Sequence, residues 1–203
     1  MRKLFLLSII LLITFLSSCV VEQNTDSYTI VKPYKLSEKE TALLQLLPLQ
    51  QEHVSFYEVT IPHKQAKIFT TIEYYQNGEK IKDIVRLSSS DFIDKKIKLA
   101  VGQQIFQHTN NETWQWFIGI DGGSMTASEN GLPNINGSAF EEINNPQNIE
   151  YNKRAVLAAW IKTNKNHISA LSIEDEESRQ RLLRENEHVY LVSIEIKRGD
   201  ASE

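Results

Sequence analysis

The feature that most constrains the fold is an Asn-Gly pair, Asn77-Gly78, placed between two stretches that alternate apolar and polar residues. Asn and Gly readily adopt the positive φ angles of a type I′ turn, whose twist matches that of paired antiparallel strands. We therefore predict a hairpin of residues 66–76 and 79–87, with the pairs Gln76–Glu79, Tyr74–Ile81 and Glu73–Lys82. This register gives a core face and a wet face. The core face would hold Ile68, Ile72, Tyr74, Ile81, Val85 and Leu87, and the wet face Lys67, Glu73, Lys80, Lys82 and Arg86.

Period-two patterns predict further strands at residues 54–61, 96–106, 113–120, 155–162, 167–171 and 189–197. The last of these has a slip in its alternation, which we interpret as a bulge. So many strands, without a strand–helix repeat, predict a mainly β fold: an antiparallel β-sandwich with one or two short helices. The alternative is an α+β fold, in which a helix packs on an antiparallel sheet.

Two short helices are predicted. The first begins at Ser37, which can form a capping box with Glu40, and ends before Pro48. Its leucine-rich face is expected to pack on the protein's own sheet; binding of a partner helix is the alternative. The second covers residues 172–185 at the surface, where the acidic residues 174–177 suit the first turn of a helix.

The first 19 residues have the layout of a secretory signal, since Arg2 and Lys3 precede an apolar run that ends in small residues. The run is shorter than the roughly 20 apolar residues of a transmembrane helix, and no basic stop-transfer cluster follows. Leu16-Ser17-Ser18-Cys19 resembles the lipobox of bacterial lipoprotein precursors. The resemblance implies cleavage before Cys19 and acylation of its sulfur. An ordinary signal peptide that ends near a buried cysteine is the alternative.

The expected organisation is a signal peptide (1–18), a lipidated Cys19 with a flexible tether (19–33), and a single globular β-rich domain (34–203). Residues 20–32 are polar and have no pattern, which is typical of a tether. In its Lys-, Asn- and Ile-rich composition the chain also resembles small uncharacterised lipoproteins of Gram-positive bacteria. The implied location is the extracytoplasmic face of the cell membrane, with the lipid as the anchor.

Charge and cysteine content narrow the partners. A net charge of −4 argues against nucleic acid, for which a basic surface would be expected. Cys19 is the only cysteine, so no intrachain disulfide can form and stability must come from packing. Nothing in the pattern indicates an oligomeric state.

Four residues are candidates for ligand binding: Trp114, Trp116, Asp121 and Ser124. Alternation places both tryptophans on one face of a strand, where they form either core or an aromatic platform for sugars or peptides. Asp121 and Ser124 lie in the Gly-rich segment 119–124, which could bind an anion but is better explained as a hairpin turn. The segment lacks the spacing of a P-loop or of a hydrolase elbow.

No cofactor, metal site or catalytic residue is predicted. The five histidines (His53, His63, His108, His167 and His188) are far apart in the sequence, although ligands can converge from distant strands. We therefore favour a non-enzymatic envelope lipoprotein that binds a protein, peptide or glycan. The alternative is a surface hydrolase, in which the fold brings Asp121 or Ser124 within about 3 Å of a histidine.

Overall fold

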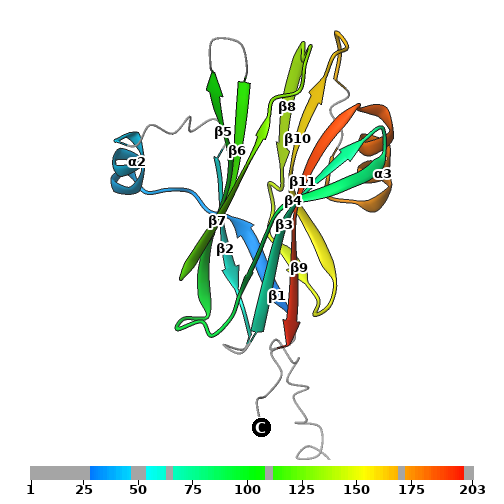
Figure 1. Ribbon diagram of the computed structural model, residues 1–203. Helices are drawn as coiled ribbons and strands as arrows, with labels where there is room; N and C mark the ends of the chain where they lie inside the picture. Colours follow the sequence, from blue (N-terminus) through cyan, green and yellow to red (C-terminus); the bar gives the residue numbers. More distant parts are fainter. Residues whose placement is uncertain (1–27, 47–53, 63–65, 108–111, 169–171, 199–203) are drawn as a thin grey trace, which may run out of the picture.

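The computed structural model describes residues 28–46, 54–62, 66–107, 112–168 and 172–198. Its strands form two antiparallel sheets packed face to face, which confirms the predicted β-sandwich (Figure 1). The first sheet has the order β7 (Gly123–Asn130), β6 (Glu112–Ile120), β5 (Lys96–Gln107), β2 (Val54–Thr60), β1 (Thr29–Pro33) and β9 (Gln147–Ile149). The second has the order β4 (Glu79–Ser89), β3 (Ala66–Gln76), β11 (His188–Arg198), β10 (Arg154–Thr163) and β8 (Gly137–Glu142).

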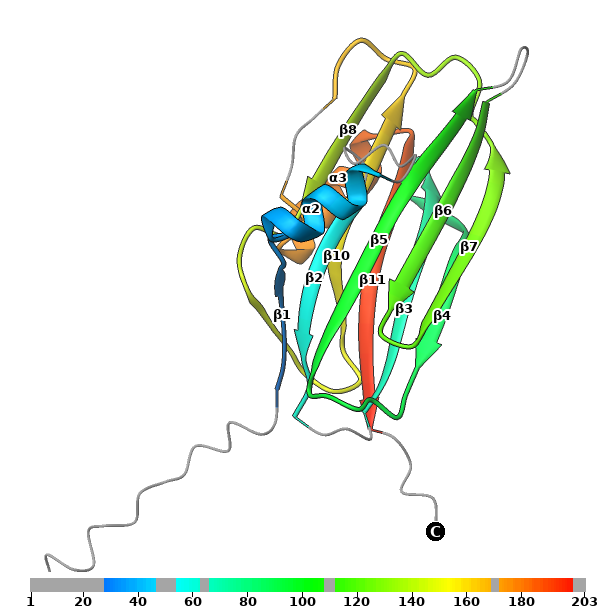
Figure 2. The same ribbon diagram turned by 90° about the vertical axis from the view of Figure 1, so that its left-hand side faces the viewer.

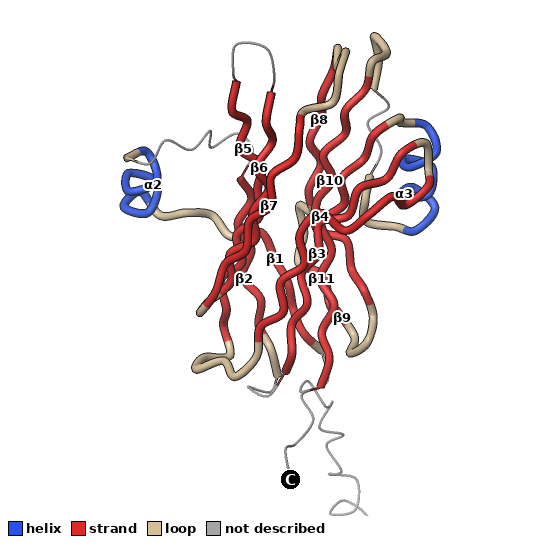
Figure 3. The backbone as a smooth tube through the Cα atoms, viewed as in Figure 1, coloured by secondary structure: helices blue, strands red, loops and turns tan. Residues whose placement is uncertain are grey.

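Two helices lie on opposite outer faces of the sandwich. Helix α2 (Glu38–Gln45) flanks the first sheet and helix α3 (Glu176–Glu185) flanks the second (Figures 1 and 3). Helix α2 begins as predicted, with the capping box of Ser37 and Glu40. Helix α3, predicted from residue 172, begins at Glu176, where the side chain of Asp175 accepts the N–H of Ser178. Among the described residues, no helix is long and apolar enough to cross a membrane.

The helices differ in how they pack. Helix α3 buries Leu182 and Leu183 against the second sheet. None of the eight described residues of α2 is buried, and Leu43 and Leu46 are 57% and 79% exposed. The prediction that the leucine-rich face of α2 packs closely on its sheet is therefore wrong.

An aromatic cluster fills the space between the sheets. Trp116 stacks on Tyr190 with ring centroids 4.4 Å apart and meets the edge of Trp160 at 5.4 Å. Trp114 meets the edge of Tyr190 at 5.9 Å, so β6 is joined through its rings to both β10 and β11. Aromatic pairs in these geometries stabilise a core beyond the burial of their area.

The hairpin prediction is confirmed at its turn and wrong further along. Asn77 and Gly78 have φ angles of 50° and 87°, and Gln76 pairs with Glu79. One register shift, between Tyr75 and Tyr74, places Tyr74 opposite Lys82 and Glu73 opposite Asp83, and a second places Ile72 opposite Val85. As a result Ile81, assigned to the core, is 50% exposed. Glu73 keeps the outward face assigned to it, yet it is only 2% exposed.

A buried ion cluster explains the position of Glu73. Its carboxylate accepts a hydrogen bond from Arg154 at 2.7 Å and pairs with Lys80. Tyr75 donates to the same carboxylate and, with Arg154, lies against helix α3. The outer face of the second sheet is thus covered, and a buried charge is tolerated there because it is paired.

The predicted end of the tether is wrong. Residues 29–33, assigned to the tether, form strand β1 between β2 and β9. Only Thr29 and Val31 are buried there, so the apolar pattern is too short to recognise in the sequence.

The predicted position of the bulge is also wrong. It was assigned to β11 but lies in β10, between Val156 and Ala158. Strand β11 pairs regularly with β3, and its long apolar run reflects burial on both faces.

The remaining strand predictions agree with the structure, with one exception. In the predicted strand at residues 167–171, His167 and Ile168 lie outside any strand and the rest is outside the described residues. Strands β7, β8 and β9 were not predicted, since all three are polar and mostly half-buried or exposed.

Candidate functional site

A hollow of about 440 Å³ lies between α2 and the outer face of the first sheet. Figure 2 shows α2 lying across this face, outside β2 and β5. We call this hollow the trough. Its lining residues are Tyr34, Leu36, Glu40, Leu43, Leu44, Phe56, Tyr57, Lys98, Leu99, Ala100, Gly119, Ile120, Asp121 and Gly123.

The floor of the trough is a row of residues that becomes smaller across the sheet. Phe56 of β2 pairs with Ala100 of β5, which pairs with Gly119 of β6. All three point outward, because their strand neighbours Tyr57, Leu99 and Ile118 are buried in the core. A Cβ added at Gly119 would meet only the Cβ of Ala100, at 4.0 Å. The hollow therefore exists because two adjacent strands carry small residues at the same level.

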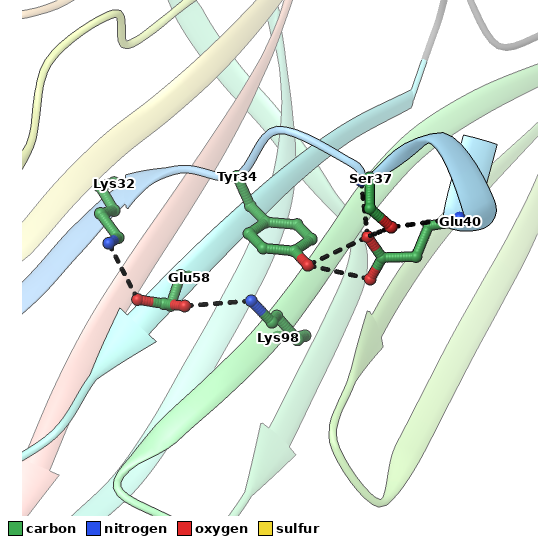
Figure 4. Close-up of polar contacts among 6 residues, drawn as sticks. All are labelled: Lys32, Tyr34, Ser37, Glu40, Glu58 and Lys98. Carbon is green, nitrogen blue, oxygen red and sulfur yellow. Dashed lines mark hydrogen bonds and ion pairs between the residues drawn. The ribbon is translucent and has the colours of Figure 1, made fainter.

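The wall of the trough is α2, which a small polar network holds in place (Figure 4). Tyr34 donates its hydroxyl to the two carboxylate oxygens of Glu40, at 2.9 and 3.1 Å. The same carboxylate accepts the backbone N–H of Ser37 at 2.7 Å. This backbone hydrogen bond is the main cause of a lowered pKa at Glu40, so the carboxylate stays ionised and keeps its partners.

A row of charged side chains lies two residues along the strands from the floor: Glu58 is two residues from Phe56, and Lys98 is two residues from Ala100. Lys32 and Lys98 each approach a different oxygen of Glu58 at 3.0 Å (Figure 4). The ammonium of Lys98 also lies 3.2 Å from the centre of the Tyr34 ring. Hydrogen bonds from the two lysines, that of Lys32 first, lower the pKa of Glu58. The row thus fixes Tyr34, and through it the start of α2, to the sheet.

A second hollow, of about 580 Å³, adjoins the trough. The two share Tyr34, Leu36, Leu44 and Phe56. We call the second one the polar hollow, because its other lining residues include Lys35, Thr41, Ser55, Glu142 and Asn144, with Pro33, Val54 and Ile143. Both hollows border α2; the trough is mainly apolar and reaches β6, whereas the polar hollow reaches β8.

The predicted ligand-binding residues are only partly brought together. Trp114 and Trp116 are 2% and 0% exposed, so they belong to the core and an exposed aromatic platform is wrong. Asp121 lines the trough and forms a two-residue turn with Gly122, whose φ is 89°, which confirms the hairpin interpretation of this segment. Ser124 is exposed on β7, outside the trough. Cys19 lies outside the described residues.

The described histidines lie at the other end of the sandwich from Asp121 and Ser124. His188 begins β11, and the hydroxyl of Tyr74 lies 2.7 Å from its Nδ1. Two residues further along β11, Tyr190 contacts the ring of Trp114, which lies near the start of β6. Ser124 pairs with Gly119, about 17 Å further along β6 at 3.3 Å per residue. His167 lies four residues after the end of β10 at Thr163, and Lys162 of that strand pairs with His188, so both histidines lie at this end. His53, His63 and His108 lie outside the described residues.

No group of three side chains suited to a metal ion occurs among the described residues. Sequence reasoning also missed the trough, because its residues come from four segments of the chain: 34–44, 56–57, 98–100 and 119–123. One signal was available: Ala100 and Gly119 are small residues at outward positions of otherwise bulky strands. A glycine inside a strand often marks the close approach of another group.

Neither the curated proteins nor the solved structures contain a match to this chain. A family does match: the model of the YgaN domain covers residues 30–196, which include every described strand from β2 to β10 and both helices. The chain therefore belongs to the YgaN domain family.

Proposed function

We propose that this protein is a lipid-anchored binding protein of the bacterial cell envelope and that the trough takes an apolar ligand. The observation that carries the binding role is the hollow between α2 and the sheet, where the exposed Leu43 and the half-buried Leu44 lie over a floor of Phe56, Ala100 and Gly119. Ligand pockets are typically hollows of this size lined mainly by apolar side chains. A ligand here would remove apolar surface from water on both sides at once.

The proposed anchor rests on the resemblance of Leu16-Ser17-Ser18-Cys19 to a lipobox. In this proposal an acyl chain is attached to the sulfur of Cys19, and two or more acyl chains on this residue would hold the protein stably at a membrane surface. Radiolabelled palmitate tests this point in cells that express the full precursor. We expect label in the unaltered protein and none in Cys19→Ala; equal labelling of the two would refute lipidation.

The binding role is tested with the full chain carrying Cys19→Ala, so that no attached lipid competes for the trough. Nile red, whose fluorescence rises in apolar surroundings, serves as the probe. Leu44→Gln should weaken probe binding about tenfold, because an amide would be placed against the ligand without a partner.

Leu46→Gln is the matched control, since it makes the same exchange one residue beyond α2 at a side chain that lines neither hollow. Equal binding by the two variants would place the probe elsewhere on the protein. That result would refute the trough as the binding site.

A further inference from the structure

The polar groups that line the trough already bind one another. The hydroxyl of Tyr34 is donated to Glu40, and Glu40 also accepts the N–H of Ser37. The ammonium of Lys98 is held by Glu58 and by the Tyr34 ring. Asp121, in the exposed turn at the rim, is the remaining charged side chain of the lining. A sugar or a peptide in the trough would lose its hydrogen bonds to water and find few replacements, at a cost of about 1–3 kcal/mol for each unpaired group.

A hydrocarbon chain carries no such cost. The backbone groups of the floor are also used, because Phe56, Ala100 and Gly119 lie inside paired strands. The apolar contacts come from both sides of the hollow, with Leu43 and Leu44 above and the floor row below. A flexible chain can fill such a narrow space without directional contacts.

The two hollows adjoin at Phe56 and Leu44 and differ in their chemistry. From Gly119 on the β6 side to these shared residues the trough is mainly apolar, and its floor spans two strand spacings, about 10 Å. Beyond them the polar hollow offers the ammonium of Lys35 and the hydroxyl of Thr41; the carboxylate of Glu142 also lines it, and the amide of Asn144 donates to the Glu142 carbonyl at 3.4 Å. An amphiphile would place its tail over Gly119 and its head near Lys35 and Thr41.

Resting on the binding role proposed for the trough, we propose that its ligand is one single-chain amphiphile, bound with the acyl tail under α2 and the head in the polar hollow. The chain carrying Cys19→Ala is titrated calorimetrically with octanoate, decanoate and dodecanoate below their micelle concentrations. Affinity should rise by up to about fourfold for each methylene added. The rise should be lost in Leu44→Gln and kept in Leu46→Gln.

The outcomes separate this proposal from the binding role itself. If Nile red binding depends on Leu44 but affinity does not rise with chain length, the amphiphile is refuted and the trough remains a binding site. If no probe depends on Leu44, both proposals fail. A rise with chain length that is equal in Leu44→Gln places the acyl chain elsewhere and also refutes the amphiphile in the trough.

Two sources could supply an acyl chain of this kind, and a second titration distinguishes them. Dodecanoate and a lysophosphatidylglycerol with the same chain are compared on the same protein. Tighter binding of the lysolipid supports a ligand drawn from membrane lipid, whereas tighter binding of dodecanoate supports a free fatty acid. Failure of both to bind refutes the proposal.

Discussion

Substituting Gly119 by valine should make the protein more stable while it blocks the trough. Gly119 lies inside β6, points outward, and does not need a positive φ angle. Glycine in a strand costs about 0.5–1 kcal/mol relative to alanine, and valine is favoured on a pleated surface. The added Cβ meets only Ala100, at an ordinary contact distance of 4.0 Å. We therefore expect the free energy of unfolding to rise by about 0.5–1 kcal/mol, or roughly 2 °C in Tm.

The same side chain would occupy the floor on which a ligand rests. Forcing extra methyl groups into a packed contact costs about 1–3 kcal/mol, so binding of Nile red or dodecanoate should weaken about 5- to 150-fold. Urea unfolding measures the first effect and ligand titration the second. Thr126→Val on the neighbouring strand is the control, because it places valine at an exposed position outside the trough and should leave binding unchanged.

Gly119→Val should therefore raise the free energy of unfolding and weaken ligand binding at the same time. A loss of stability in Gly119→Val would contradict the open space above β6. Unchanged binding in a more stable variant would show that the ligand does not touch the floor, and the trough would be refuted as its site.

Three further predictions concern the fold. Iodide should barely quench the fluorescence of the three tryptophans, which are at most 2% exposed; strong quenching would contradict their place in the core. Glu73→Ala should lower the free energy of unfolding in urea by about 1–2 kcal/mol, because Arg154 and Tyr75 lose the carboxylate to which they donate; Arg154 and Lys80 are partly exposed, so water replaces part of the lost interaction. The exposed Glu79→Ala should change it by under about 0.5 kcal/mol. The fold lowers the pKa of Glu58, so the stability that its carboxylate adds is fully present above the unfolded pKa of about 4.3 and is lost as pH falls through the folded pKa. The difference in free energy of unfolding between the protein and Glu58→Gln should therefore shrink on acidification. A difference that stays constant with pH would refute this.

Turn chemistry and capping are local, and these were predictable from sequence. The Asn77-Gly78 and Asp121-Gly122 turns and the capping box at Ser37 each depend on a few adjacent residues. The register of β3 with β4 was not predictable beyond the turn, because it shifts twice. The burial of Glu73 was not predictable either, because its partner Arg154 comes from β10, far along the chain. A hydrophobic pattern assigns charge to solvent unless that partner is known.

Strand β6, which carries Trp114 and Trp116, is a second case in which contacts with distant residues decided what the sequence pattern left open. Alternation correctly placed Trp114 and Trp116 on one face, but the face was decided by contacts with Tyr190 and Trp160, which lie far along the chain. The trough depends even more on distant segments. Phe56, Ala100 and Gly119 become neighbours only through the register of three strands. The hollow also depends on helix α2, which lies over them without burying any of its own residues.

Helix α2 should gain order when the trough is filled. A helix of eight residues is marginal in water, and α2 obtains little help from burial, so it depends on the Ser37–Glu40 box and on Tyr34. A ligand that packs against Leu43 and Leu44 would bind the ordered helix better than the frayed one, and by linkage it must stabilise the ordered form. Hydrogen exchange of the α2 amides should therefore slow on addition of dodecanoate while the exchange of β11 stays unchanged. Ser37→Ala, which removes a cap worth about 1 kcal/mol, should speed exchange in α2 and weaken the ligand about fivefold without shifting global unfolding. Uniform slowing across the whole chain would show that the ligand stabilises the sandwich rather than the helix, and the coupling between α2 and the trough would be wrong.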